Sequence, residues 1–320
     1  MREPLLEVRH LKKYFPTKKG LLHAVDDVSF SIPEGKTLGL VGESGCGKST
    51  TGRVILRLHE ATGGEVLYRG RNVLELSKGE MRGMRRKMQI VFQDPYSSLN
   101  PRMSVRSLIE ESLKQQRGDL TAAEREKKVL DIMDLVGLER RLEHAYPHEL
   151  DGGRRQRIGI ARALVLEPEF VVLDEPVSAL DVCVQAQILN LLMDLQKELG
   201  LTYLFISHNL SVVKHISDEI AVMYLGRLVE QADHETIFKD PKHPYTKALL
   251  SAIPTPDPTV RPDRIILEGD VTSPINPPPG CRFRPRCRAA VPVCKDVCPE
   301  LKQCGDGIVA CHLCGGEKQA

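Results

Sequence analysis

Gly42-Glu43-Ser44-Gly45-Cys46-Gly47-Lys48-Ser49 is the most informative stretch of this 320-residue chain. It matches G-x-x-x-x-G-K-[ST], the pattern of a phosphate-binding loop. The apolar run at residues 37–41 predicts a short buried strand before it, and residues 50–58 predict a helix after it. Glycines let backbone N–H groups turn toward an anion, and the helix dipole favours negative charge at its start. We therefore expect Lys48 to reach the β- and γ-phosphates of a nucleotide and Ser49 to hold Mg²⁺.

The composition of the chain argues against several classes of protein. Lys+Arg 45 and Asp+Glu 43 give a net charge of +2, which indicates no nucleic-acid partner. Aromatic residues make up 4% of the chain, and they are not interleaved with basic residues as in base-stacking proteins. No apolar run is long enough to span a membrane, and the N-terminus lacks the apolar stretch of a signal peptide. We expect the protein to stay in the cytosol.

A second apolar run, at residues 170–173, is followed by Asp174 and Glu175. An acidic residue after a buried strand can hold Mg²⁺, and a carboxylate beside it can polarise the attacking water. The alternative is that both carboxylates cap the following turn. Together with the phosphate loop, the pattern favours the catalytic interpretation.

Two more polar side chains follow predicted strands. Gln93 comes after the strand predicted at residues 88–92, and His208 comes after the one at 201–207. In open parallel sheets, ligands bind at the carboxyl ends of the strands. Gln93 would ligate Mg²⁺ or position water, and a neutral His208 would contact the γ-phosphate, although either residue alone is more often ordinary surface. Pro95 is expected to end regular structure, which places Gln93 on a loop.

The rest of the pattern predicts an α/β protein. Strands are expected at residues 5–11 and 28–32, an edge strand at 65–70, and a hairpin around Gly226. Thr121 and Glu124 form a capping box that opens a helix in a helical, charged region. From Asp240 onward, prolines mark a loop-rich tail with little apolar periodicity.

The segment 150–154 has two glycines, Gly152 and Gly153, before a predicted helix. Such a pair can form a tight turn. It can equally begin a second anion-binding helix that acts on a nucleotide held by another chain.

Seven of the nine cysteines fall between Cys281 and Cys314. In a reducing compartment, such a cluster favours metal binding over disulfides. The pairs Cys294-x3-Cys298 and Cys311-x2-Cys314 have spacing suited to zinc. A metal would stabilise a tail that is poor in core-forming pattern.

The order and spacing of these segments closely resemble an ATPase subunit of an ABC transporter. The matching elements over residues 5–232 are the phosphate loop, the Gln93 loop, the signature at 150–154, the strand ending in Asp174 and Glu175, the loop at 178–181, and His208. The segments at residues 93–101, 243–250 and 277–281 are similar to the dipeptide/oligopeptide importer branch. The resemblance covers nearly the whole chain.

This resemblance implies a RecA-like P-loop ATPase core with an antiparallel β subdomain. It implies an ABC ATPase domain at residues 1–240, with a helical insert at about 96–160, and a loop-rich C-terminal importer region at 241–320. Two subunits would face head to tail, so that each ATP lies between one chain's phosphate loop and the other chain's signature. The residues implied to contact the nucleotide are Tyr14, which would stack on adenine, and Gly42, Ser44, Gly45, Cys46, Gly47, Lys48, Ser49, Thr50, Asp174, Asp151, Gly152 and Gly153.

The implied function is ATP hydrolysis that drives uptake of di- or oligopeptides. A nickel or glutathione importer and a partly degenerate regulatory cassette are the alternatives. The implied partners are a second ATPase subunit, expected to be a paralogue, two transmembrane permease subunits and, indirectly, a solute-binding protein. The subunit would lie on the cytoplasmic face of the membrane as a peripheral protein.

The chain departs from the family pattern at three positions. Asp151 and Arg154 replace the Ser and the final Gln of the signature Leu-Ser-Gly-Gly-Gln, and Asn209 replaces the Asp after the switch histidine. A carboxylate at Asp151 would face the γ-phosphate held by the partner, so a weakened site is expected. Arg154 or Arg155 could offset part of that repulsion.

The resemblance also places thiols at Cys281, Cys287, Cys294 and Cys311, as in importer ATPases that carry a 4Fe–4S cluster. Four thiolates suit such a cluster, and zinc remains the alternative. Loss of the metal is expected to loosen the tail rather than the ATP site. Cys46, near a helix start and Lys48, is expected to favour the thiolate.

Overall fold

The computed structural model describes residues 4–253, 264–269 and 272–314. The chain forms two compact parts. We call residues 6–31, 37–74 and 207–320 the phosphate-loop part, and residues 1–5, 32–36 and 75–206 the signature part.

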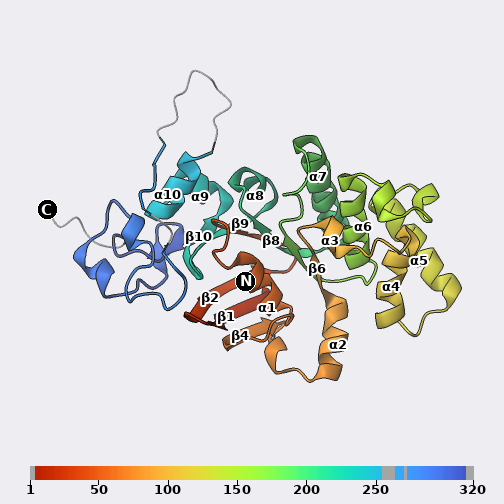
Figure 1. The fold of residues 1–320 in the computed structure, drawn as a ribbon, viewed down its shortest axis with the longest axis horizontal. Helices are drawn as coiled ribbons and strands as arrows, with labels where there is room; N and C mark the ends of the chain where they lie inside the picture. The colour runs from red at the N-terminus through yellow and green to blue at the C-terminus, as the bar shows by residue number, and fades with distance from the viewer. Residues whose placement is uncertain (1–3, 254–263, 270–271, 315–320) are drawn as a thin grey trace, which may run out of the picture. The chain divides into compact units, whose positions relative to one another are not determined.

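An antiparallel sheet lies in the phosphate-loop part, with strand order β2-β1-β4-β5 (Figure 1). Its strands are β1 (Pro4–Thr17), β2 (Gly20–Pro33), β4 (Gly63–Tyr68) and β5 (Arg71–Asn72). The strand expected at the edge, over residues 65–70, is β4, and it pairs with both β1 and β5. That expectation of an edge position is wrong, because the turn at Gly70 returns the chain as a further short strand.

A second sheet in this part follows the order β3-β9-β10-β12-β11. Its strands are β3 (Thr37–Val41), β9 (Glu219–Tyr224), β10 (Arg227–Asp233), β11 (Lys302–Cys304) and β12 (Gly307–Val309). β3 runs parallel to β9, and all five of its residues are buried. β9 and β10 form the hairpin expected around Gly226, and β12 pairs antiparallel with β10. The C-terminal region thus extends the sheet that carries the phosphate loop.

The helices of the phosphate-loop part are α1 (Lys48–Ile55), α8 (Leu210–Ile216), α9 (His234–Lys239) and α10 (Pro244–Ser251). Beyond α10, the described tail contains the turns η4 (Arg284–Arg286) and η5 (Pro292–Lys295) and the β11–β12 hairpin. A stretch of this tail lines the edge of β2. Asn276 exchanges hydrogen bonds with Leu21 at 2.9 and 3.0 Å, and the N–H of His23 donates to Pro274 at 3.0 Å. The tail therefore covers backbone groups that an open sheet edge would expose.

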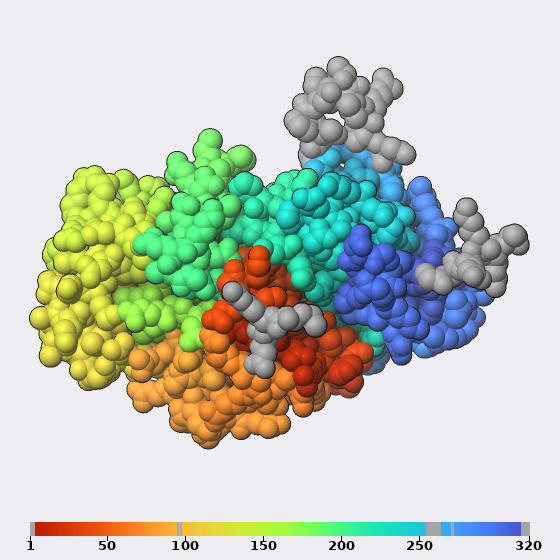
Figure 2. All heavy atoms as spheres, turned by 180° about the vertical axis from the view of Figure 1, so that it is seen from behind, coloured from red at the N-terminus to blue at the C-terminus, as the bar shows by residue number. Residues whose placement is uncertain are grey.

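The signature part contains parallel strands in the order β8-β7-β6: β6 (Met88–Val91), β7 (Phe170–Asp174) and β8 (Thr202–Ser207). Its helices are α2 (Lys78–Lys87), α3 (Pro95–Ser98), α4 (Val105–Gln116), α5 (Ala122–Leu135), α6 (Gly152–Leu164) and α7 (Val182–Leu199). Its short turns are η2 (Arg140–Leu142) and η3 (Pro147–Glu149), and the turn η1 (Val73–Glu75) lies at the boundary between the two parts in the sequence. Helices α4, α5 and α6 pack on one another, and Figure 2 shows this region in yellow to green.

Local signals at helix starts are confirmed with one exception. Thr121 and Glu124 make the expected capping box at the start of α5. Pro95 was expected to end regular structure, and that expectation is wrong. Asp94 caps the short helix α3 and Pro95 is its first residue, a position where a proline loses no helical hydrogen bond. In the described part of the chain, no helix is both long and apolar enough to cross a membrane.

Candidate functional site

The phosphate loop turns closely against neighbouring backbone. Gly42 has φ 153° and Gly47 has φ 107°. A Cβ at Gly42 would lie 2.1 Å from the carbonyl oxygen of Met223, and one at Gly47 would lie 2.0 Å from that of Ala24. Only glycine fits at these two positions.

The loop leads directly into α1, whose start is open. Gly47 is the N-cap residue, and no described side chain caps it with a hydrogen bond. The buried ammonium of Lys48 donates to the loop carbonyls of Gly42 and Glu43, at 2.8 and 3.0 Å. Gly45 lies in the loop with φ 78°, and Ser49 and Thr50 lie in the first turn of α1. The arrangement combines a helix start with a held cation, and this pair of features favours an anion.

Cys46 does not have the reactive environment that was expected. Its side chain is buried, with 4% of the residue exposed. Burial raises the pKa of the Cys46 thiol, and the nearby Lys48 opposes this effect without overcoming it. The expectation of a thiolate is therefore wrong, because the cost of burying the charged form exceeds the attraction to Lys48.

Tyr14 belongs to a hydrogen-bonded network in the phosphate-loop part. Its ring stacks on His23 with centroids 4.1 Å apart, and its hydroxyl donates to Asp26 at 2.5 Å. Asp26 also pairs with Arg282 and, at 3.3 Å, with Arg227. Burial and the hydrogen bond to Asp26 raise the pKa of Tyr14 to about 12. Burial pushes the pKa of Asp26 upward, but the Tyr14 hydroxyl and the two guanidinium groups outweigh it and lower that pKa.

In the signature part, β7 ends at the buried Asp174, and Glu175 follows. The side-chain amide of Gln93 donates to the Glu175 carboxylate at 2.9 Å, so these two predicted site residues lie together. Glu175 has φ 49°, an uncommon value for a non-glycine residue, and its N–H donates to Ile206 at 2.9 Å. The backbone thus holds the carboxylate at the end of the strand.

The signature segment begins α6 with its own cap. Asp151 accepts the N–H of Arg154 at 2.8 Å, and the Arg154 guanidinium pairs with Asp151 and with Glu139, at 3.2 and 3.3 Å. Arg155 is engaged elsewhere, since it donates to Pro147 and lies 3.8 Å above the ring of Tyr96. Of the two arginines considered, Arg154 is therefore the one that pairs with Asp151.

Gly152 and Gly153 occupy the first turn of α6. A Cβ at Gly153 would lie 2.8 Å from the Val184 side chain of α7, so close helix packing requires this glycine. His208 directly follows β8, in the phosphate-loop part. The neighbouring Asn209 caps α8 by accepting the N–H groups of Ser211 and Val212, at 3.0 and 3.4 Å. Asn209 therefore performs the capping role for which an Asp is equally suited.

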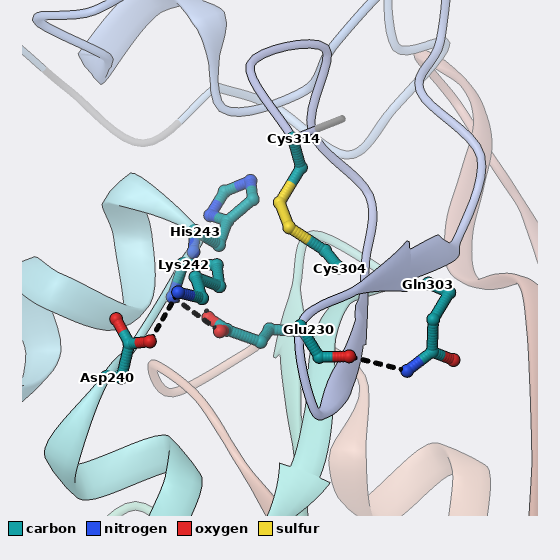
Figure 3. Close-up of a disulfide and its surroundings, with 8 residues drawn as sticks. Glu230, Asp240, Lys242, His243, Gln303, Cys304 and Cys314 are labelled. Atoms are coloured by element: carbon teal, nitrogen blue, oxygen red, sulfur yellow. Dashed lines mark hydrogen bonds and ion pairs between the residues drawn. A yellow bond between two sulfur atoms is a disulfide. The ribbon is translucent and has the colours of Figure 1, made fainter. Parts of the chain in front are cut away.

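The C-terminal cysteines divide into two groups. Cys304 and Cys314 form a disulfide with Cα atoms 6.0 Å apart, shown in Figure 3. Beside it, Lys242 donates its backbone N–H to Glu230 at 2.6 Å and pairs with Asp240. The disulfide runs against the expectation that metal binding is favoured over disulfides in this cluster, at least for Cys304 and Cys314. It also removes Cys314 from the set proposed for zinc.

The four thiols expected to hold a cluster lie near one another. Burial raises the pKa of Cys281 to about 11, and the nearby thiols of Cys294 and Cys311 add to the effect. Burial likewise raises the pKa of Cys287, with Cys311 and Cys294 contributing. Within the described ranges, no group of three or more His, Cys, Asp or Glu side chains is placed to hold a metal ion. The residues therefore do not fit a site for a single zinc ion, in which each Zn–S bond is about 2.3 Å.

Sequence reasoning missed two residues that contact the phosphate loop, and the loop residue that they contact. Glu43 was read only as a variable position of the loop, and Tyr245 and Arg286 were not assigned a role. Tyr245 accepts the N–H of Glu43 at 2.9 Å, and Arg286 pairs with its carboxylate at 2.9 Å. The sequence of residues 243–250 resembles that of peptide importers, which drew attention to this segment. It gave no indication of which residues the segment contacts.

Comparison with known proteins shows the family to which the chain belongs. A family model described as ABC transporter matches residues 25–178, and one described as oligopeptide/dipeptide transporter, C-terminal region, matches residues 229–294. The putative oligopeptide transport ATP-binding protein YkfD of Bacillus subtilis is 55% identical over 98% of this chain and 96% of its own length. The dipeptide transport ATP-binding protein DppF of Escherichia coli is 52% identical over 97% of this chain and 95% of its own length.

Solved structures of ATP-binding cassettes share the fold of this chain. The dimeric ATP-binding cassette MJ0796 bound to ADP and Pi has a TM-score of 0.65 at 29% identity, over 72% of this chain and 98% of that one. The cassette cbiO1 of Clostridium perfringens, part of the transporter complex cbiONQ, has a TM-score of 0.66 at 28% identity, over 75% of this chain and 92% of that one. The expected RecA-like P-loop ATPase core is confirmed. This chain is an ATPase of the ABC transporter family, in the branch that carries the oligopeptide/dipeptide transporter C-terminal region.

Proposed function

We propose that this chain hydrolyses ATP to drive an importer for dipeptides or oligopeptides. The observation that carries the proposal is the open start of α1, where Lys48 is held over the glycine loop. The match to the oligopeptide/dipeptide transporter C-terminal region and the similarity to peptide transport ATP-binding proteins support the choice of peptides as cargo.

In this proposal, the two parts of the chain have distinct roles. In the phosphate-loop part, the backbone N–H groups of residues 44–45 and 47–50 and the Lys48 ammonium bind the phosphates, Tyr14 stacks on adenine, and His208 contacts the γ-phosphate. In the signature part, Glu175 polarises the attacking water and the Gln93 amide orients its carboxylate. Within the phosphate-loop part, the Ser49 hydroxyl is the proposed Mg²⁺ ligand, and within the signature part Asp174 and Gln93 are the candidate ligands. When bound, Mg²⁺ would neutralise developing charge on the phosphates.

The proposed partners are a second ATPase subunit, expected to be a paralogue, and two transmembrane permease subunits that receive a solute-binding protein. The chain would act at the cytoplasmic face of the membrane. Asp151 favours a paralogous partner, because a paralogue with an unaltered signature would complete the site at this chain's phosphate loop.

We also propose that Cys281, Cys287, Cys294 and Cys311 hold a 4Fe–4S cluster. The support for it is the spacing of the four cysteines, which resembles that of importer ATPases that carry such a cluster. The four cysteines would then act as ligands that stabilise the tail.

Transport by the reconstituted complex tests the proposed function. Proteoliposomes that contain this chain and its permease partners should take up a labelled dipeptide only when ATP is present. Lys48→Ala should lower uptake by about 100-fold or more, because the loop loses its phosphate-binding cation. Lys197→Ala on the exposed face of α7 is the matched control and should behave as wild type. Uptake of nickel or glutathione in place of peptide would overturn the assigned cargo, and uptake that survives Lys48→Ala would overturn the assigned loop.

Anaerobic purification tests the cluster separately. Iron and sulfide close to four per chain, with visible absorption that is lost in Cys287→Ser and kept in Cys183→Ser, would support it. Stoichiometric zinc without a visible band, or a metal-free tail that remains ordered, would exclude it.

A further inference from the structure

Two residues of the C-terminal region hold the phosphate loop directly. The Arg286 guanidinium donates from one nitrogen, Nη1, to both carboxylate oxygens of Glu43, at 3.1 and 2.9 Å. The Tyr245 hydroxyl accepts the backbone N–H of the same Glu43 at 2.9 Å. Glu43 is the second residue of the loop, so one loop residue is fixed through both its backbone and its side chain.

A buried aromatic cluster fixes Tyr245 and Arg286 in turn. The ring centroid of Tyr224 lies 4.7 Å from that of Tyr245 and 5.2 Å from that of Phe283, and the rings of Tyr245 and Phe283 are 5.4 Å apart. All three side chains are buried. Phe283 directly precedes the turn Arg284–Arg286, so its insertion among these rings places Arg286 beside the loop. The contacts to Glu43 therefore come from a preorganised structure and not from mobile surface side chains.

The charge of Glu43 gives these contacts a further role. A carboxylate in a loop that binds phosphate opposes the incoming anion, and opposite charge nearby offsets that repulsion. The Arg286 side chain is 10% exposed and that of Glu43 is 29% exposed, so solvent screens this pair only in part. With Arg286 in place, the loop presents its N–H groups and Lys48 without an uncompensated negative charge.

We propose that Arg286 and Tyr245 are positioning residues for the phosphate loop, through which the C-terminal region sets the affinity of this chain for ATP. The inference rests on the proposed assignment of the loop to ATP. This proposal differs from the expectation that loss of a metal would loosen the tail and leave the ATP site unchanged. Arg286 directly precedes Cys287, so a change in the segment that carries the proposed cluster ligands would reach the nucleotide loop through one residue.

The first test compares Arg286→Gln with Arg288→Gln in the assembled transporter. Arg288 lies in the same segment, but it is exposed and pairs with Glu268 at 2.9 Å, away from the loop. Arg286→Gln should raise the KM for ATP and the Kd for a fluorescent ATP analogue by about fivefold, which is the size expected for one charge-assisted hydrogen bond in a partly exposed setting. The kcat should change by less than about twofold, and Arg288→Gln should match wild type. A KM in Arg286→Gln equal to that in Arg288→Gln would overturn the proposal.

A second variant separates loop positioning from general loss of structure. Adding Glu43→Gln to Arg286→Gln removes the uncompensated carboxylate, so the double variant should bind ATP more tightly than Arg286→Gln alone. A merely structural role predicts further weakening in the double variant, and that result would overturn the proposal. Arg286→Lys keeps a positive charge and should retain most of the affinity, which covers the case in which Arg286→Gln fails to fold.

Tyr245→Phe tests the second contact. It keeps the ring in the aromatic cluster and removes only the acceptor of the Glu43 N–H, so a rise of about twofold to fivefold in KM is expected. An unchanged KM would remove Tyr245 from the proposal. Wild-type protein that binds no ATP analogue would instead overturn the proposed function, so the two failures are distinguishable.

Discussion

The starts of α1 and α6 both carry glycine, yet they differ in whether a side chain of the protein accepts their free backbone N–H groups. α1 begins at Gly47 in a left-handed conformation, and no described side chain caps it. α6 begins at Asp151, whose carboxylate accepts the N–H of Arg154 and pairs with its guanidinium. A helix start favours negative charge in either case. The first leaves that place for an external anion, whereas the second already contains its own.

The difference has an energetic consequence for any nucleotide that α6 would face. Two like charges about 4 Å apart repel by about 4 kcal/mol at an effective dielectric constant of 20. The pairing of Arg154 with Asp151 offsets part of that repulsion, and because both side chains are more than a third exposed, the offset is screened. The loop before α1 is held by Arg286 and Tyr245 through Glu43, whereas the start of α6 is held by its own residues.

The largest effect is expected when the carboxylates of Glu175 and Asp151 are each replaced by the corresponding amide. Glu175→Gln should lower ATP turnover by roughly 10²- to 10⁴-fold while ATP still binds, because a positioned base is lost. Asp151→Asn keeps a capping side chain and removes only the charge, so turnover should be unchanged or higher. Steady-state ATPase assays of the assembled transporter measure both. Equal losses in the two variants would mean that Asp151 also acts in catalysis.

Asp26→Asn tests the network that holds Tyr14 and Arg282. Removing one partner of a buried ion pair typically costs about 3–5 kcal/mol at neutral pH. The folded-state pKa of Asp26 is lowered, so its contribution is present above the unfolded value and is lost as pH falls through the folded value. The gap in urea stability between wild type and variant should therefore shrink below about pH 4.

Asp27→Asn is the control for this comparison. Asp27 pairs with the exposed His10 at 2.8 Å, and a surface pair of this kind contributes at most about 1 kcal/mol. A loss in Asp27→Asn as large as that in Asp26→Asn would show that burial of the pair is not the cause.

The two cysteines outside the tail should differ in reactivity. Cys46 is buried and its pKa is raised, whereas Cys183 is exposed at the start of α7. We expect maleimide to label Cys183 at least about tenfold faster, since the thiolate is the reactive form and access is required. Mass spectrometry of tryptic peptides gives both rates. Bound ATP should slow labelling of Cys46 further and leave Cys183 unchanged, and equal rates with and without ATP would count against the loop assignment.

The smallest effect is expected for the N-cap of α6, Asp151. Asp151→Ala should lower the free energy of unfolding by about 1 kcal/mol, the usual loss for a helix cap, whereas Asp151→Ser should lose only a few tenths. Asp151→Ser should also raise ATPase activity if the carboxylate opposes a phosphate. Thermal denaturation and ATPase assays of both variants check these outcomes, and a stable but inactive Asp151→Ser would mean that the site accommodates the carboxylate.

The sequence alone was enough to locate functional residues that belong to a local sequence pattern. The phosphate loop is contiguous, and the contacts around Gly42 and Gly47 tolerate only glycine, so a pattern of eight residues located it. The proximity of Gln93 and Glu175 could also be inferred, because both follow neighbouring parallel strands and the ends of such strands lie at one edge.

The sequence alone did not predict the surroundings of a side chain where residues distant in the sequence form them. The thiolate expected for Cys46 was based on its neighbours in the chain, but its burial is set by the whole fold. Glu43 and Arg286 are 243 residues apart, and no local pattern relates them. The Cys304–Cys314 disulfide was missed because spacing alone does not specify which cysteines pair.

The pairing of Asp26 with Arg282 has a consequence for how the protein is made. The two residues are 256 positions apart in the sequence. Asp26 is therefore synthesised long before Arg282, its buried partner. At about 5–20 residues per second, the delay is roughly 13 to 50 seconds. During that interval Asp26 and the edge of β2 lack the contacts that the tail later supplies. The nascent chain therefore exposes a sheet edge to chaperones, and a messenger truncated before codon 282 would yield a protein arrested in that exposed state.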